Sequence, residues 1–436
     1  MPRSLTIEKD WLDQPSASDA LERRTWACLR IEAAGLSVTR LWDAGADTER
    51  TGLYIPTFSL AAWIVQNWWP LLYEPIRGER LPPPDSLSQC AWYRRHCLRC
   101  ADSDLLLPRA FIYGDADDVC IQWQADDVAY PHMPGRFIES GFTRVARTAV
   151  ESELREFVTS VLGRAGSLHD SRVLALRDNW NAICTAEAAE AAFCQAAGRM
   201  GLDPYQCESW EPAVTRLLES EMADKVNTPL VADFLEAVNM RDAIASWHWV
   251  ADATTEFDLH PAPRRQPHPI APRLTAAATG YALAHEVRLQ AGLGEMDAVG
   301  NVGDIAGHLG VGHFIFQPRN HLPSASIKAT VGWQTVDHLL VVGPELREEN
   351  QRFLEARGLY QGRLANSRGP RLVTSAHTWD QQTARAFAAE LLAPRAAMVE
   401  RMPTTDAAVE ALAREYRVST RVIEHQLENA GIDVWA

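Results

Sequence analysis

The chain has 436 residues, of which 47% are hydrophobic and 23% charged, and its formal net charge at pH 7 is -15. This length predicts two to four globular domains rather than one core. The acidic balance and the absence of a basic tract disfavour a duplex-binding surface, which must neutralise phosphates. The sequence contains neither a run of about 18 apolar residues nor an apolar leader, so we expect a cytoplasmic protein without a membrane partner.

Residues 1–165 are typical of a mixed α/β domain rich in tryptophan. The segments 25–31 and 36–44 favour two strands, and 109–124 favours a hairpin because two apolar runs flank a turn sequence. A helical pattern over 143–165 is expected to close this domain.

Three tryptophans lie on a helix predicted over 59–74, namely Trp63, Trp68 and Trp69. Side chains five positions apart on a helix diverge by about 140°, so these rings cannot form one flat platform. We therefore expect core packing for them rather than ligand stacking.

The middle of the chain, 166–258, has a helical pattern throughout. The stretch that follows, "HPAPRRQPHPIAPR", is dense in proline, which resists both helices and strand ladders. We therefore expect a linker at 259–272 and a further domain over 273–436.

The last part of the chain alternates between helical and strand patterns. "VGDIAGHLGVGHFIFQP" predicts a short helix and a strand, and "SIKATVGWQTVDHLLVVG" predicts two strands around Gly332. A long helix follows through "QRFLEARGLYQ", from Gln351 to Gln361, and further helices extend toward the C-terminus. The chain as a whole is thus predicted to be an α+β multidomain protein.

Three motifs in this last part resemble those of the ImmA/IrrE family of bacterial zinc metallopeptidases. Arg352-Phe353 and Ala356 match the family's R-F-x-L-A-H-E-x-G-H helix. "ARAFAAELLAP" (384–394) and "LAREYRVS" (412–419) match its E-x-x-A-N-x-F-A-A-E-L-L-x-P and L-A-x-x-F-x-V-S segments, in the same order. The resemblance covers about 273–432 and implies a zincin-like domain there.

The family's zinc-binding residues are replaced in this sequence. In H-E-x-x-H, two histidines at i and i+4 share a helical face and bind the metal, and the glutamate acts as general base. In register, these three positions are Arg357, Gly358 and Gln361, and the family's third ligand falls on Gln381. Arg has no lone pair to donate and carries a fixed positive charge, and Gly358 offers no base. We expect no catalytic residue, bound metal or cofactor at this position.

Two arrangements could accommodate the arginine in place of the metal. Arg357 could pair with a nearby acid of the same chain, Asp380 being the obvious candidate. Alternatively, Arg357 and Gln361 together could hold a carboxylate of a bound partner, because a guanidinium binds carboxylates through two parallel hydrogen bonds.

Other metal candidates have weaker patterns. "CAWYRRHCLRC" offers a single C-x-x-C, whereas a structural zinc site usually has a second pair at defined spacing. Reduced thiols are therefore the expected state of the four cysteines concerned: Cys90, Cys97, Cys100 and Cys120. His308, His313 and His321 cluster in sequence, but histidines on a strand and its loops are usually hydrogen-bonded or exposed rather than metal-bound.

We therefore expect a non-catalytic regulatory, sensing or scaffolding protein that binds another protein or a peptide. The resemblance implies a setting in bacterial stress response, mobile elements or phage defence. Two alternatives stay open: an active metallopeptidase or other hydrolase with a non-standard site, and a subunit of a complex that acts on nucleic acid. The C-terminal helix pair after 406 has the helix-turn-helix pattern, but Glu424 and Glu428 on its second helix favour structural packing over DNA reading.

Overall fold

The computed structural model describes residues 4–12, 17–78, 81–82, 90–127, 135–166, 168–257, 275–319, 322, 324–365 and 369–432. The chain divides into two compact units, Met1–Val226 and Asn227–Ala436, and it is mixed α and β, as predicted. The helices predicted over 166–258 are divided between the two units, and the predicted linker at 259–272 lies outside the described residues. None of the described helices combines the length and apolar character needed to cross a membrane.

The described residues of the first unit form three antiparallel sheets. Their strand orders are β1-β2-β3 with β6 also paired to β2, β10-β8-β7, and β5-β4-β9. The strands are β1 (Leu5–Trp11), β2 (Trp26–Ala33), β3 (Leu36–Ser37), β4 (Leu41–Asp43), β5 (Thr48–Arg50), β6 (Leu53–Pro56), β7 (Arg109–Asp115), β8 (Asp118–Gln124), β9 (Gly135–Phe137) and β10 (Gly141–Ala146). The hairpin predicted over 109–124 is confirmed as β7 and β8.

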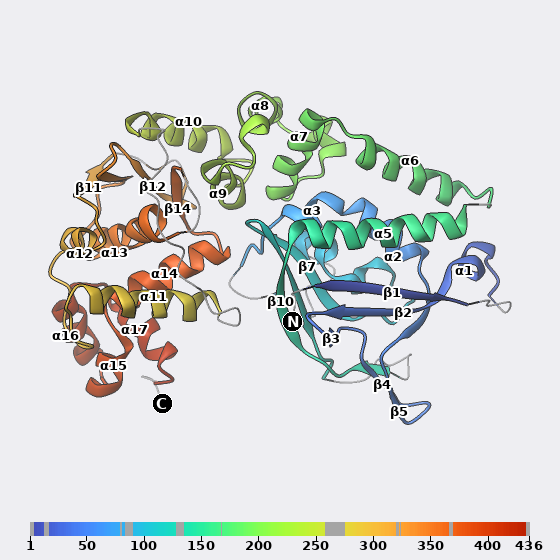
Figure 1. Ribbon diagram of the computed structural model, residues 1–436, viewed down its shortest axis with the longest axis horizontal. Helices are drawn as coiled ribbons and strands as arrows, with labels where there is room; N and C mark the ends of the chain where they lie inside the picture. The colour runs from blue at the N-terminus through green and yellow to red at the C-terminus, as the bar shows by residue number, and fades with distance from the viewer. Residues whose placement is uncertain are drawn as a thin grey trace. The chain divides into compact units, whose positions relative to one another are not determined.

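Helices cover the sheets of this unit, and α5 runs along β1 and β2 (Figure 1). The helical elements are α1 (Ala20–Thr25), α2 (Phe58–Gln66), α3 (Trp68–Tyr73), α4 (Ala91–His96), η2 (Leu98–Ala101), α5 (Arg147–Ala165), α6 (Ser171–Thr185), α7 (Ala188–Arg199), η3 (Pro204–Ser209), α8 (Pro212–Leu217), η4 (Leu218–Met222) and η5 (Ala223–Lys225). Trp63, Trp68 and Trp69 are all buried, so the prediction of core packing is confirmed.

Two local predictions for the first unit were wrong. The helix predicted over 59–74 is interrupted at Asn67, which separates α2 from α3. The helix predicted from 143 begins only at 147, because β10 occupies the preceding residues. Thr143 and Val145 are buried and Arg144 between them is not, which is the alternation of a strand.

The second unit is built on one four-stranded sheet of order β11-β13-β12-β14. Its strands are β11 (His313–Pro318), β12 (Ile327–Trp333), β13 (His338–Gly343) and β14 (Arg371–Thr374). β11 is parallel to β13, and the other pairs are antiparallel. The turn between β12 and β13 falls at 334–337, so Gly332 lies within a strand and not at the turn where we had placed it.

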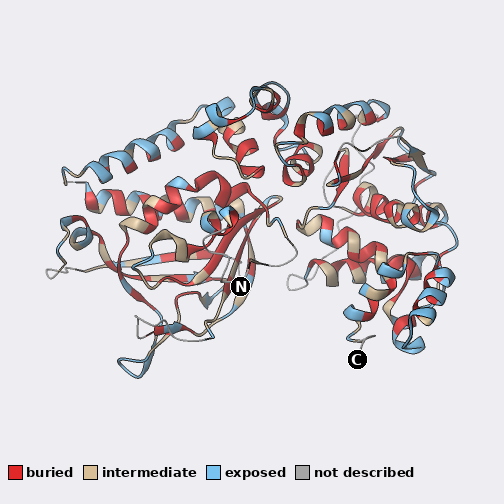
Figure 2. Cartoon of the chain, turned by 180° about the vertical axis from the view of Figure 1, so that it is seen from behind, coloured by how far each residue is buried: buried red, intermediate tan, exposed pale blue. Residues whose placement is uncertain are grey.

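Helices pack on the sheet and on one another. They are α9 (Pro229–Ala237), α10 (Ala243–Ala253), η6 (Thr254–Glu256), α11 (Ala276–Gln290), α12 (Val302–His308), α13 (Glu348–Leu359), η7 (Tyr360–Leu364), α14 (Trp379–Leu392), α15 (Arg395–Arg401), α16 (Asp406–Tyr416) and α17 (Thr420–Asn429). Figure 2 shows that α13 and α14 are largely buried, whereas α16 and α17 bury one face and expose the other. The helix pair predicted after 406 is confirmed as α16 and α17, with a break at 417–419 between them.

Candidate functional site

Two of the positions at which the resemblance places metal ligands meet inside the second unit. Arg357, near the end of α13, donates from Nη2 to Oε1 of Gln381 on α14 at 2.9 Å. The same nitrogen donates to the carbonyl of Thr374, at the end of β14, at 2.6 Å. Gln361 lies one turn after Arg357 in η7 and is also buried. Helices distant in sequence thus bring an arginine and an amide together where the resemblance places a metal.

Gln381 takes the place of a neighbouring strand at the edge of the sheet. Its Oε1 accepts from the backbone N–H of Thr374 at 3.0 Å, and its Nε2 donates to the carbonyl of Leu372 at 2.7 Å. β14 is an edge strand, so these backbone groups would otherwise be buried without partners. An ionised carboxylate accepts but cannot donate, so glutamate could not make both bonds.

Gly358 serves packing rather than the polar cluster. A Cβ at this position would lie 2.6 Å from Cγ2 of Val341 on β13, and one at Gly362 would lie 2.5 Å from Cδ1 of Leu339. Glycines four residues apart therefore let α13 and η7 approach the sheet closely. From the sequence, the glycine is identified only as a lost general base, whereas the close contact with the sheet explains why a glycine stands here.

The residues at this position do not fit a divalent metal. Burial, together with the nearby charge of Arg385, lowers the pKa of Arg357 to about 9, and the group remains a cation at neutral pH. Within the described structure, both polar atoms of the Gln361 amide and Nε of Arg357 have no hydrogen-bond partner. A zinc ion needs lone pairs from three or more ligands, and the Gln381 oxygen is already used by two donors.

The expected pairing of Arg357 with Asp380 was wrong. Asp380 instead accepts from Nη2 of Arg371 at 3.0 Å. Arg371 also binds both carboxylate oxygens of Asp233 on α9, at 2.7 and 3.0 Å. Burial opposes the charge of Arg371, but the two carboxylates outweigh it and hold its pKa above the usual range. Because Arg371 lies on the sheet edge beside both acids, it takes the carboxylate that we had assigned to Arg357.

The four cysteine candidates do not gather into a metal-sized group among the described residues. Cys97 is fully buried and shares a hydrogen bond with Cys100, while Cys90 precedes α4. Cys120 is buried beside Asp115, at 3.7 Å from its Oδ2, and burial raises the pKa of the Cys120 thiol well above its usual range. Zinc binds the thiolate, so this cysteine is a poor ligand.

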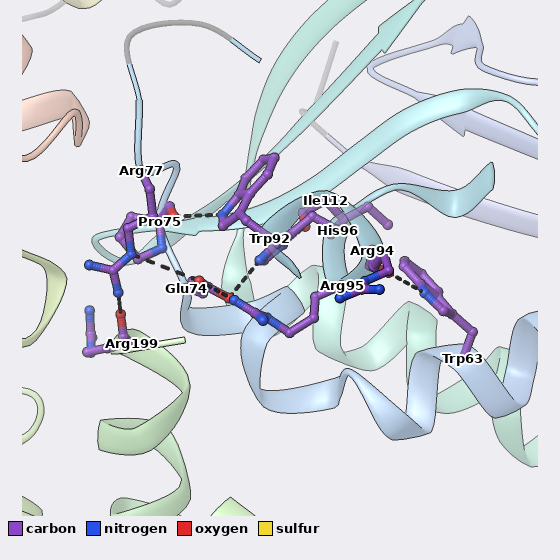
Figure 3. A network of polar contacts seen from close by, with 10 residues as sticks. All are labelled: Trp63, Glu74, Pro75, Arg77, Trp92, Arg94, Arg95, His96, Ile112 and Arg199. Carbon is purple, nitrogen blue, oxygen red and sulfur yellow. Dashed lines mark hydrogen bonds and ion pairs between the residues drawn. The ribbon is translucent and has the colours of Figure 1, made fainter. Parts of the chain in front are cut away.

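A buried charge cluster near these cysteines escaped sequence reasoning (Figure 3). Glu74, directly after α3, accepts from Arg95 at 2.7 and 2.9 Å and faces Nε2 of His96 at 3.0 Å. The other ring nitrogen of His96 faces the carbonyl of Ile112 at 2.6 Å. Burial opposes the carboxylate charge, but His96 and Arg95 outweigh it and lower the pKa of Glu74 to about 2. The available signal was an acid directly after the apolar run "WWPLLY".

Comparison of the chain with protein-family models, with curated proteins and with solved structures finds no match. We therefore infer function from the side chains and their geometry.

Proposed function

We propose that this chain is a non-catalytic regulatory, sensing or scaffolding protein whose second unit uses a zincin-like, ImmA/IrrE-type frame without its metal. One observation carries the proposal. Arg357 is buried and hydrogen-bonded at the position where the resemblance places the zinc. A guanidinium there supplies charge and donors but neither a Lewis acid nor a metal-bound nucleophile.

The closed state of this cluster favours an internal role for the arginine over capture of an external carboxylate. Arg357, Gln361 and Gln381 are each at most 5% exposed. A partner's carboxylate would have to displace the Thr374 carbonyl or the Gln381 amide to reach the guanidinium. We therefore place partner binding on a different surface of the second unit.

The outer edge of β11 is the surface we propose for a bound peptide. β11 pairs with β13 on one side, and the described strands supply no partner on the other. Ile315, in the middle of β11, is 39% exposed. An uncovered edge strand presents backbone donors and acceptors to which an extended peptide can add as a further strand.

Two measurements on the full chain test the absence of metallopeptidase activity. We expect the zinc content after dialysis to be equal in the wild type, Gln361→Ala and Gln381→Ala, because neither amide binds the ion. We also expect hydrolysis of fluorescent casein to be equal with and without chelator. Zinc that is lost on Gln381→Ala, or hydrolysis that a chelator abolishes, would overturn the proposal.

A matched pair of variants tests the binding surface. Ile315→Lys should abolish capture of a partner that the wild type retains, because it adds a charge on the exposed edge strand. Leu289→Lys is the control, since Leu289 is 60% exposed on α11. Equal capture by both variants would remove the β11 edge from the proposal.

A further inference from the structure

Two histidines begin neighbouring strands of the second unit. β11 and β13 run parallel, and His313 and His338 are the first paired residues of their register. Parallel strands that begin in register start at the same end of the sheet, so both imidazoles lie at that end. Their ring centroids are 4.4 Å apart with the planes at 78°.

Asp337 joins these histidines from the turn before β13. Its Oδ1 lies 3.6 Å from Nε2 of His338. The three side chains offer ligand atoms that all lie within 4.8 Å of one another, and no other group of three or more His, Cys, Asp or Glu in the described residues does so. His313 and Asp337 are exposed and His338 is half-buried, so the group opens to solvent.

The surrounding turn holds the carboxylate in position. The Thr335 hydroxyl donates to Oδ1 of Asp337 at 2.8 Å and also accepts from the backbone N–H of His338. The backbone N–H of His313 donates to the carbonyl of Asp337 at 3.0 Å, which ties the turn to β11. A Cβ on Gly312 would lie 3.0 Å from Oδ2 of Asp337, so the glycine leaves room for the carboxylate.

We propose that His313, Asp337 and His338 form a binding site for a divalent transition metal, with Zn²⁺ as the expected ion. Two imidazoles and one carboxylate are a ligand set that zinc takes readily when one position stays open. At a zinc–nitrogen distance of about 2.0 Å, tetrahedral ligand atoms lie about 3.3 Å apart. Small side-chain rotations bring the three ligands to this spacing.

The open coordination position faces solvent beside the start of β11. A water molecule or a donor atom from a bound peptide can occupy it. The site shares no residue with the buried cluster of Arg357, Gln361 and Gln381, which we call the Arg357 cluster. It goes beyond the proposed function because metal binding here does not require a bound peptide. The Thr335 hydroxyl is a positioning group in this site, since it orients a ligand without touching the metal.

The test uses the full chain after metal depletion and titrates it with Zn²⁺ in a calorimeter. We expect one ion per chain at this site, with affinity reduced at least about 100-fold in His313→Ala and in His338→Ala. Thr335→Ala should weaken binding about 10-fold, as loss of a group that orients a ligand does. His285→Ala, an exposed histidine on α11, should bind as the wild type does.

Because the chain has eight cysteines, Co²⁺ serves as a second probe. We expect cobalt at this site to give ligand-field absorption without a thiolate charge-transfer band, and both histidine variants to lose that absorption. Binding that is unchanged in the variants, or absent from the wild type, overturns the site. Zinc that persists in His313→Ala/His338→Ala but is lost on Gln381→Ala contradicts the proposed function instead, so the two failures are distinguishable.

Discussion

Each unit buries a charged side chain, Glu74 in the first and Arg357 in the second, but the two charges have different partners. Glu74 is bound by a guanidinium and faces an imidazole. Arg357 donates only to neutral oxygens, and its Nε has no partner within the described structure. Glu74 and Arg357 are therefore buried to a similar extent, but only Glu74 has partners of opposite charge.

The pKa of each group moves downward, with opposite meanings. For an acid, a pKa lowered to about 2 means that the folded protein favours the charged form. For a base, a pKa lowered to about 9 means that the folded protein disfavours it. The Glu74 cluster therefore stabilises the first unit through its charge, whereas Arg357 is retained in the second unit despite its charge.

The largest expected effect is the loss of the Glu74 charge. Glu74→Gln should lower the free energy of unfolding by about 3 kcal/mol, because it leaves buried His96 without its carboxylate. Denaturant melts measure this change. Glu156→Gln, which alters a 70% exposed partner of Lys9, should change stability by less than about 0.5 kcal/mol. Equal effects in both variants would contradict the assignment of Glu74 as a stabilising charge.

The same charge predicts a defined acid sensitivity. The folded-state pKa of Glu74 is lowered from 4.5 to about 2, so its contribution is complete above pH 4.5 and disappears as the pH falls toward 2. Over this interval the wild type should lose about 3 kcal/mol that Glu74→Gln does not lose. Parallel stability curves for the two proteins between pH 5 and about 2 would refute this contribution.

A smaller effect is expected from crowding the helix that carries Arg357. Gly358→Ala should destabilise the protein by about 1–3 kcal/mol, because its Cβ would meet the Val341 side chain at 2.6 Å. Gly307→Ala on α12 is the matched control, since nothing lies within 4 Å of the added Cβ and alanine favours the helix by up to about 1 kcal/mol. If both variants were stabilised, the close approach of α13 to the sheet would not constrain residue 358.

The sequence predicted the secondary-structure elements better than it predicted which side chains contact one another. Periodicity located the β7–β8 hairpin and the helices that carry Arg357 and Gln381, because these signals are local. It did not show that Asp233 binds Arg371, since these two residues are 138 positions apart in sequence and meet only through folding. His313 was weighed with its sequence neighbours, whereas the other two proposed ligands, Asp337 and His338, lie in the turn before β13 and at the start of β13.

A still smaller effect is expected at Arg357 itself. Arg357→Met removes a disfavoured charge but leaves the Thr374 carbonyl without this donor, so stability should change by less than about 1 kcal/mol. Arg357→Ala also leaves a void and should cost about 1–3 kcal/mol. Thermal and denaturant melts of both variants measure the difference. A loss above about 3 kcal/mol for Arg357→Met would show that the charge stabilises the fold, and the contrast with Glu74 would fail.

The last prediction is the absence of an effect. A chelator should leave the melting temperature of the double variant His313→Ala/His338→Ala unchanged. A metal that binds only the folded state stabilises it in proportion to its occupancy, so removing it must lower the melting temperature. Arg357, Gln361 and Gln381 do not together offer the three ligand atoms that such an ion needs. The double variant also removes the proposed surface site. A decrease of several degrees would therefore reveal a further structural metal. The next substitutions would then be at Cys90, Cys97 and Cys100, the thiols closest in sequence to the Glu74 cluster.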